Sequence, residues 1–145
     1  MKKLFTFLSI IIAVAISFHF ISNHYRYSIH DWLIQFEASN ANLKYKSNSV
    51  PKTHYFKQQV FTYLEGPKLK GQKNILMIHG FGSAKEDWLQ YAGFLSSQYH
   101  IVAVDLLGSG GNRPDLTQKY SIKNQVEYVH QTTKVLGLEK FYLIG

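Results

Sequence analysis

Three short apolar runs that alternate with two helix-forming segments constrain the fold more than any other feature of this 145-residue chain. The runs lie at residues 74–78, 101–104 and 141–144, and the amphipathic segments lie at 87–98 and 121–136. Runs this short with few polar residues are typical of strands buried on both faces. Because strands that alternate with helices form right-handed crossovers, the pattern predicts a doubly wound α/β domain with a parallel sheet.

The second helical segment carries signals at both of its ends. Ser121 can cap the first turn, and Gly137 is a typical stop. The apolar face expected for this helix consists of Ile122, Val126, Val129 and Leu136. In the first segment the helical face consists of Trp88, Tyr91, Ala92 and Leu95.

The residues before this pattern are less regular. Residues 53–64 are rich in Tyr, Phe, Val and Thr and precede a Glu-Gly-Pro sequence, which predicts two short strands or a hairpin. Residues 38–52 contain several Asn and Ser residues and are expected to form a linker. Aromatic and aliphatic residues spaced three and four apart over residues 24–40 predict a short amphipathic helix, whose aromatic face could contact either the membrane interface or the domain.

An uncharged apolar run occupies residues 4–21 and follows Lys2 and Lys3. Its length lies at the lower end of the roughly 17 to 25 residues that span a bilayer. A cleaved signal peptide is the alternative, because residues 13–15 (Ala-Val-Ala) resemble a cleavage site. Both interpretations carry the rest of the chain across the cytoplasmic membrane, either anchored on its outer side or secreted. The expected division is therefore 1–22 anchor or signal, 23–52 helix and linker, and 53–145 the N-terminal part of the α/β domain.

The formal net charge of +7 is concentrated in one stretch of the chain. Residues 41–75 hold one acidic residue and seven lysines: Lys44, Lys46, Lys52, Lys57, Lys68, Lys70 and Lys73. These lysines could contact anionic lipid headgroups, and Lys44, Lys46, Lys52 and Lys57 lie closest to the apolar run. An ordinary solvated basic face explains them equally well. No nucleic-acid-binding module accompanies the lysines, so a nucleic-acid partner is not expected.

Several kinds of site are excluded by composition. The chain has no cysteine, so it can form neither disulfides nor thiolate metal sites, and it has no cysteine nucleophile. Its seven histidines include no His-Glu-x-x-His sequence, so a zinc-protease site has no support. We expect neither a metal ion nor an organic cofactor.

Ligands of open parallel sheets bind beyond the carboxyl ends of the strands, so the loops after the three apolar runs are where chemistry is expected. The first loop reads His-Gly-Phe-Gly-Ser from His79, the second reads Asp-Leu-Leu-Gly-Ser-Gly-Gly-Asn-Arg-Pro from Asp105, and the third begins at Gly145. The second loop does not match the Gly-x-Gly-x-x-Gly fingerprint of dinucleotide-binding proteins, because Arg113 occupies the position of the third glycine and no helix is expected to begin there.

Over residues 53–145 the chain resembles the α/β-hydrolase family, with lipases, esterases and related serine hydrolases as the nearest relatives. In that family a His-Gly-Phe-Gly loop follows the third strand, an Asp-x-x-Gly-x-Gly loop with a nearby Arg-Pro follows the fourth, and Gly-x-Ser-x-Gly follows the fifth. The first two signatures are present here in order and at matching spacing. The resemblance implies that residues 53–145 form strands 1 to 5 of the family's sheet.

The resemblance also implies roles for individual residues. The Phe81 N–H is expected to be one of the two donors of the oxyanion hole, which binds the negative charge formed on an ester oxygen. Gly80 and Gly82 let the backbone turn and approach the substrate. His79 is expected to support this loop by hydrogen bonding rather than act as the base, and Asp105 with Arg113 is expected to hold the second loop.

The resemblance places the nucleophile at the turn after the fifth strand, where Gly145 fits the first glycine of Gly-x-Ser-x-Gly. Neither Ser83 nor Ser109 stands in such a frame. Since the order in the family is nucleophile, acid and histidine, all three are expected beyond Gly145. The 145 residues alone are then expected to be inactive.

These observations predict a carboxylic-ester hydrolase that acts on ester or lipid substrates, most similar to a triacylglycerol lipase. An epoxide hydrolase, dehalogenase or carbon–carbon hydrolase of the same fold is the first alternative, although epoxide hydrolases commonly have proline where Gly82 stands. A membrane-tethered binding protein that keeps the fold without catalysis is the second alternative.

Overall fold

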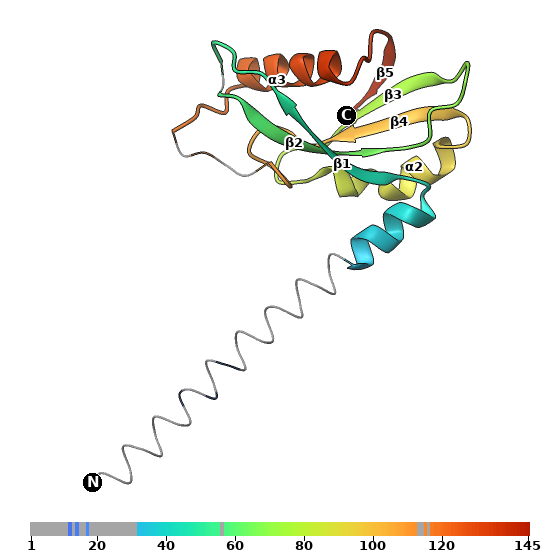
Figure 1. The fold of residues 1–145 in the computed structure, drawn as a ribbon, viewed down its shortest axis with the longest axis horizontal. Helices are drawn as coiled ribbons and strands as arrows, with labels where there is room; N and C mark the ends of the chain where they lie inside the picture. Colours follow the sequence, from blue (N-terminus) through green and yellow to red (C-terminus); the bar gives the residue numbers. More distant parts are fainter. Residues whose placement is uncertain are drawn as a thin grey trace. The chain divides into compact units, whose positions relative to one another are not determined.

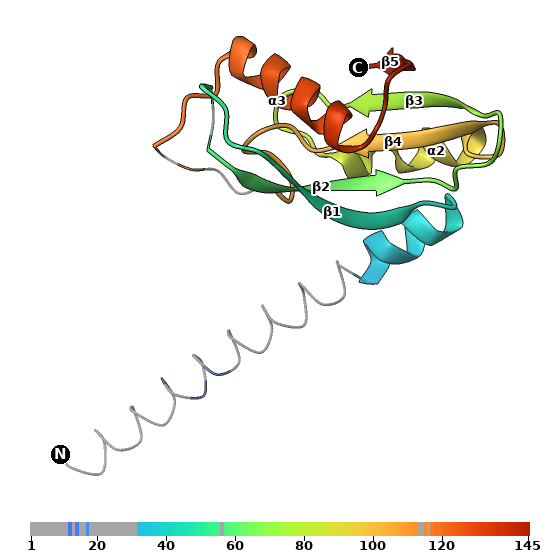
Figure 2. The same ribbon diagram turned by 45° about the horizontal axis from the view of Figure 1, so that its top comes forward.

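The computed structural model describes residues 32–55, 57–112, 115 and 117–145, together with Ile12, Val14 and Ser17. The chain divides into two compact units, Met1–Ile34 and Gln35–Gly145. The second unit contains a five-stranded sheet with helices on both of its faces, as Figures 1 and 2 show. It therefore has the α/β architecture that the alternating pattern predicts.

The five strands form one sheet in the order β1-β2-β4-β3-β5. Their bounds are β1 Lys44–Val50, β2 Gln59–Glu65, β3 Lys73–Ile78, β4 Tyr99–Val104 and β5 Phe141–Ile144. β3 lies between β4 and β5 and is parallel to both. The three apolar runs thus form the parallel part of the sheet, as predicted.

The expectation of a wholly parallel sheet is wrong for the N-terminal strands. β2 is antiparallel both to β1 and to β4, with Tyr63 opposite Val104, so the sheet is mixed. A short connection joins β1 to β2, and a short connection can join neighbouring strands only in the antiparallel sense. A parallel arrangement would have required a crossover helix between them.

Strand β1 occupies a segment that was expected to be a linker. Its sequence, KYKSNSV, is polar and mostly exposed, so no apolar pattern marks it as a strand. Its backbone nevertheless pairs with β2 along its whole length, and Val50 at its end is fully buried. Lysines on a strand at the edge of a sheet discourage pairing with other chains, which accounts for this composition.

Helices cover the two faces of the sheet separately. The 3₁₀ turn η1 (Lys85–Trp88) runs into α2 (Leu89–Leu95), and Leu89 packs with Ile75 and Ile101 on one face. α3 (Ile122–Val135) packs on the opposite face through Tyr128, together with Leu76 and Val102. Figure 2 shows α3 and α2 on opposite sides of the sheet. The three-layer core explains why the residues of β3 and β4 are apolar on both faces.

Helix α3 has the predicted ends and part of the predicted face, since Val129 and Leu136 pack against the core around Tyr128. Ser121 caps the helix by accepting a hydrogen bond from the Asn124 N–H, as expected. Ile122 and Val126, however, are 80% and 64% exposed, while Asn124, Tyr128 and Thr132 are buried. The helix docks partly through polar groups that bond to neighbouring loops, so its buried face cannot be found from apolar spacing alone.

The N-terminal predictions concern residues that are mostly outside the described part of the chain. Residues 32–40 are helical, which agrees with the end of the helix predicted over 24–40. Of the apolar run at 4–21, only Ile12, Val14 and Ser17 are described. A search of the described residues finds no helix with the length and apolar character needed to span a bilayer.

Candidate active site

The parallel strands bring the three predicted loops to one edge of the sheet. Ile78 at the end of β3 pairs with Val104 at the end of β4, and Met77 pairs with Ile144 of β5. His79, Asp105 and Gly145 each follow one of these strand ends. A Cβ atom placed on Gly145 would lie 3.5 Å from the Ile78 oxygen, so the start of the third loop adjoins the start of the first.

The loop from His79 to Ser83 presents an open backbone surface. The Phe81 side chain is fully exposed, and its N–H donates no hydrogen bond to any described residue. Gly82 has a φ of 75°, a left-handed conformation that glycine adopts readily. Cβ atoms built on Gly80 and Gly82 would meet no other atom within 4 Å. Space in front of this backbone is therefore available to a ligand.

His79 links the first loop to the second. Its side chain is buried, and its Nδ1 lies 2.8 Å from the Gly80 oxygen while its Nε2 lies 3.0 Å from the Leu106 nitrogen. Because a backbone N–H can only donate and a carbonyl oxygen can only accept, Nε2 is the acceptor and Nδ1 carries the proton. Both ring nitrogens thus form hydrogen bonds to backbone groups, which leaves neither free for proton transfer.

Asp105 is fully buried and is the centre of the second loop. Its carboxylate accepts hydrogen bonds from the Lys85 N–H at 2.9 Å, the Gly111 N–H at 2.9 Å and the Thr62 hydroxyl at 2.8 Å. A Cβ atom on Gly110, whose φ is 54°, would overlap this carboxylate. The loop is therefore wound tightly around Asp105, which faces protein groups rather than the open edge.

Lys85 is a buried cation that sequence reasoning missed. Its side chain is only 3% exposed, and its Nζ lies 2.7 Å from both Asp105 Oδ2 and Glu86 Oε1. The same nitrogen lies 5.3 Å from the centre of the Tyr45 ring. A lysine that starts a polar Lys-Glu-Asp sequence is normally solvated, so its burial has no signal in the local sequence.

Asn112 is a second missed residue that fixes this loop. Its buried side-chain amide donates to the Asp105 carbonyl oxygen at 2.8 Å and to the Tyr128 hydroxyl at 2.8 Å, and its Oδ1 accepts from the Thr62 N–H at 3.1 Å. It thereby ties the loop to β2 and α3. Arg113, the predicted partner of Asp105, lies outside the described residues, so its role stays a prediction.

The protonation of Asp105 follows from these contacts. Burial alone would raise the pKa of the carboxyl, but the hydrogen bonds from Lys85 and Gly111 outweigh it and hold the pKa below its ordinary value. A carboxyl with a lowered pKa in the folded state stabilises the fold above its unfolded pKa of about 3.9. That stabilisation is lost as the pH falls through the folded pKa.

The variant Asp105→Asn is expected to be less stable than the wild type at pH 7, and the difference should shrink as the pH falls below about 4. The reason is that protonation removes the charge from Asp105 in the wild type, whereas Asn has no charge to lose. Urea unfolding followed by circular dichroism across this pH range measures the difference. A gap in unfolding free energy that stays constant with pH would contradict the assigned ion pair.

The described residues show no activated serine at Ser83 and no group of metal ligands. The Ser83 hydroxyl donates to the Asp87 carboxylate rather than to an imidazole. No three histidine or acidic side chains among the described residues are grouped to hold a metal ion. The geometry therefore offers an exposed backbone N–H at Phe81 on a loop that His79 holds in place.

Comparison with known proteins agrees with this geometry. The sequence model of one family, described as alpha/beta hydrolase fold, matches residues 73–145. Monoacylglycerol lipase abhd6-A from Xenopus laevis is 37% identical over 87 residues, which are 59% of this chain and 26% of that protein. Lipase 3 from a Moraxella species is 30% identical over 113 residues, which are 78% of this chain and 34% of that protein.

A solved structure extends the similarity over nearly the whole chain. The crystal structure of a membrane phospholipase A, described as a bacterial virulence factor, superposes with a TM-score of 0.70 at 29% identity. The superposition covers 99% of this chain and 43% of the other. The chain spans less than half the length of each of these three proteins.

Proposed function

Because the chain belongs to the α/β-hydrolase family, we propose that its residues form the oxyanion-hole side of a carboxylic-ester hydrolase that acts on lipid esters. The observation that carries this proposal is the exposed backbone at Phe81, whose N–H has no partner among the described residues and which belongs to the loop that begins beside Gly145, after Ile78. Relatives named monoacylglycerol lipase, lipase and phospholipase A support the substrate class.

The residues of the first loop each have a role in the proposed reaction. When a nucleophile attacks an ester carbonyl, negative charge forms on the carbonyl oxygen and must be stabilised by donors that are already in place. The Phe81 N–H is one such donor, and a single donor of this kind is worth about 2.7 to 4 kcal/mol. Gly80 and Gly82 leave the approach open, and His79 fixes the loop through its bond to Leu106.

The nucleophile, the acid and the catalytic histidine are proposed to lie beyond Gly145, with serine as the nucleophile. The carboxyl end of β5 supports this placement, because in open α/β sheets the groups that contact ligands follow the strand ends. The apolar run at residues 4–21 and the basic pair before it support attachment to the outer side of the cytoplasmic membrane, or export if the run is cleaved. A triacylglycerol or similar neutral glyceride is the proposed substrate.

The 145-residue chain alone is expected to hydrolyse p-nitrophenyl butyrate no faster than buffer, because no serine in it stands in a Gly-x-Ser-x-Gly frame. A longer gene product that contains these residues and a serine elbow is expected to hydrolyse both this ester and a monoacylglycerol. Release of nitrophenolate and of fatty acid measures the two reactions. Turnover by the 145-residue chain that disappears in Phe81→Pro would show that the proposed division of the catalytic groups is wrong.

A further inference from the structure

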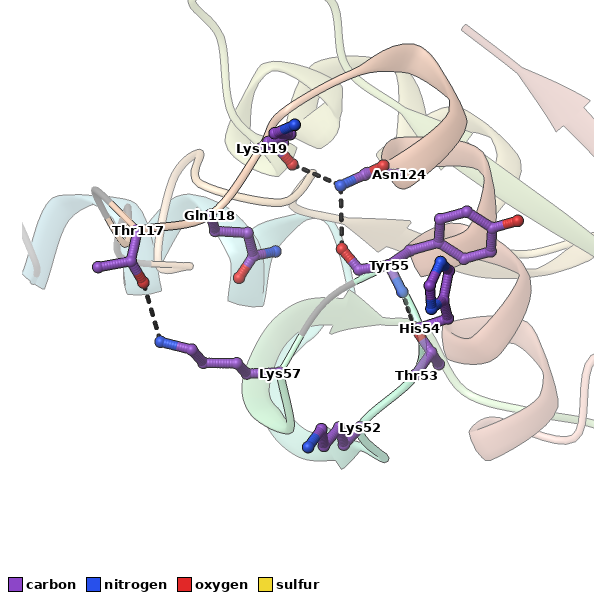
Figure 3. A pocket seen from close by; sticks show the side chains of 9 residues that line it. All are labelled: Lys52, Thr53, His54, Tyr55, Lys57, Thr117, Gln118, Lys119 and Asn124. Atoms are coloured by element: carbon purple, nitrogen blue, oxygen red, sulfur yellow. Dashed lines mark hydrogen bonds between the residues drawn. The ribbon is translucent and has the colours of Figure 1, made fainter.

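A basic pocket lies at the same edge of the sheet as the candidate active site and is separate from it. It has a volume of about 460 Å³ and is formed by the β1–β2 connection and the segment before α3 (Figure 3). Because Tyr63 pairs with Val104, the start of β2 extends beyond the carboxyl end of β4. The β1–β2 connection therefore lies at the edge where the Asp105 loop also begins.

The described side chains that line the pocket include several cations and no carboxylate. Lys52, Lys57 and Lys119 line it together with His54. Lys57 is partly neutralised, since its Nζ lies 3.1 Å from the Asp115 carboxylate and 2.9 Å from the Thr117 hydroxyl. Lys52 and Lys119 form no ion pair within the described residues. The pocket therefore keeps a positive charge that a ligand could neutralise.

Asp115 is ionised at neutral pH and offsets the charge of Lys57. Two hydrogen bonds from Thr117, with further help from Lys57, lower the pKa of Asp115 to about 2. The carboxylate therefore stays ionised at neutral pH and remains engaged with Lys57 and Thr117. It holds Lys57 and Thr117 in place, while Lys52 and Lys119 have no counterion among the described residues.

Gln118 supplies the second, independent sign of a ligand. Its side-chain Nε2 is buried and has no hydrogen-bond partner among the residues that the structure describes. Figure 3 shows this amide extending into the space enclosed by the lining side chains. A buried donor without an acceptor is costly, and native structures rarely keep one without a reason. An acceptor oxygen in the pocket would satisfy it.

We propose that this pocket binds a phosphate group of the kind carried by an anionic phospholipid headgroup. A phosphate offers three or more acceptor oxygens with full negative charge, which matches lysine ammonium groups and an amide donor arranged around one space. The volume accommodates a glycerophosphate. This binding function does not depend on ester hydrolysis and would hold if the catalytic proposal failed.

Calorimetric titration of the whole chain in a non-ionic detergent tests the proposal with three soluble probes: dihexanoyl phosphatidic acid, glycerol 3-phosphate and inorganic phosphate. Binding of at least one probe is expected, and a shift of the Gln118 side-chain amide signal in a nitrogen–proton NMR spectrum should accompany it. Tighter binding of the phosphatidic acid identifies a lipid headgroup as the source. Equal or tighter binding of inorganic phosphate identifies a soluble phosphate.

The double variant Lys52→Gln/Lys119→Gln should weaken binding at least about tenfold, as the loss of a hydrogen bond to a charged group does. The matched control Lys70→Gln/Lys134→Gln removes the same charge from two exposed lysines that do not line the pocket. It should weaken binding by less than about threefold. Equal weakening in both variants, or no shift of the Gln118 signal, would overturn the proposal in favour of a general basic surface.

Discussion

Replacement of Phe81 by proline in an active protein that contains these residues is expected to lower kcat for ester hydrolysis by roughly a hundred- to a thousandfold. Proline has no backbone N–H, so the variant lacks one donor to the developing oxyanion. Phe81 is not among the residues with positive φ, and the preceding residue is glycine, which has no Cβ to clash with the proline ring. The side chain is fully exposed, so its loss removes no packing.

The variant Phe81→Ala is the matched control for this experiment. It removes the same side chain but keeps the N–H, so its kcat should stay within a few-fold of the wild type. Steady-state kinetics on p-nitrophenyl butyrate compare the variants, and circular dichroism confirms that each is folded. Equal losses in Phe81→Pro and Phe81→Ala would assign the effect to the side chain and would remove the oxyanion role.

Replacement of Lys85 by methionine is expected to destabilise the domain by about 3 to 5 kcal/mol. The change leaves the fully buried Asp105 carboxylate without the cation 2.7 Å away. Removal of one partner from a buried pair is costly because the remaining charge has neither water nor a counterion. Since domains are stable by only about 5 to 15 kcal/mol, this loss is a large fraction of the total stability.

Urea unfolding at neutral pH measures this loss against two further variants. Lys70→Met removes an exposed lysine and should change the unfolding free energy by less than about 0.5 kcal/mol. The double variant Lys85→Met/Asp105→Leu leaves no buried charge and should recover part of the loss, which gives the coupling between the two residues. A loss below about 1 kcal/mol in Lys85→Met would show that Asp105 does not depend on this lysine.

The parallel part of the fold could be predicted because its signals are local. The runs that became β3, β4 and β5 are short and apolar. β3 and β4 are buried on both faces in the core around Leu76 and Ile101, whereas β5 at the edge of the sheet is mostly exposed. The ends of α3 were predictable as well, since Ser121 and Gly137 act on the turns beside them.

Strand β1 and the docking face of α3 could not be predicted, because both depend on distant partners. β1 is a strand because its backbone pairs with that of β2. Its own Lys, Ser and Asn residues favour a loop. Similarly, Asn124 of α3 is buried because its amide reaches the Tyr55 and Lys119 carbonyl oxygens. No period in the sequence of α3 indicates these contacts.

The candidate site also has a part that could be predicted from the sequence and a part that could not. The positions of His79, Asp105 and Gly145 followed from strand ends, which parallel pairing brings to one edge. The contacts that make the loops rigid did not follow, because Lys85 and Asn112 reach Asp105 through the tertiary fold. A buried lysine in a polar sequence has the same local pattern as a solvated one.

Labelling of the active protein with a fluorophosphonate tests the central claim most directly. This probe reacts with activated serines, and trypsin cleaves after Lys140, so the modified peptide can be identified by mass spectrometry from its start at Phe141. We expect the label on a serine at the second position after Gly145, and loss of hydrolysis in step with labelling. An aspartate at that position, or a label on Ser83 or Ser109, would contradict the assignment of a serine ester hydrolase to this chain.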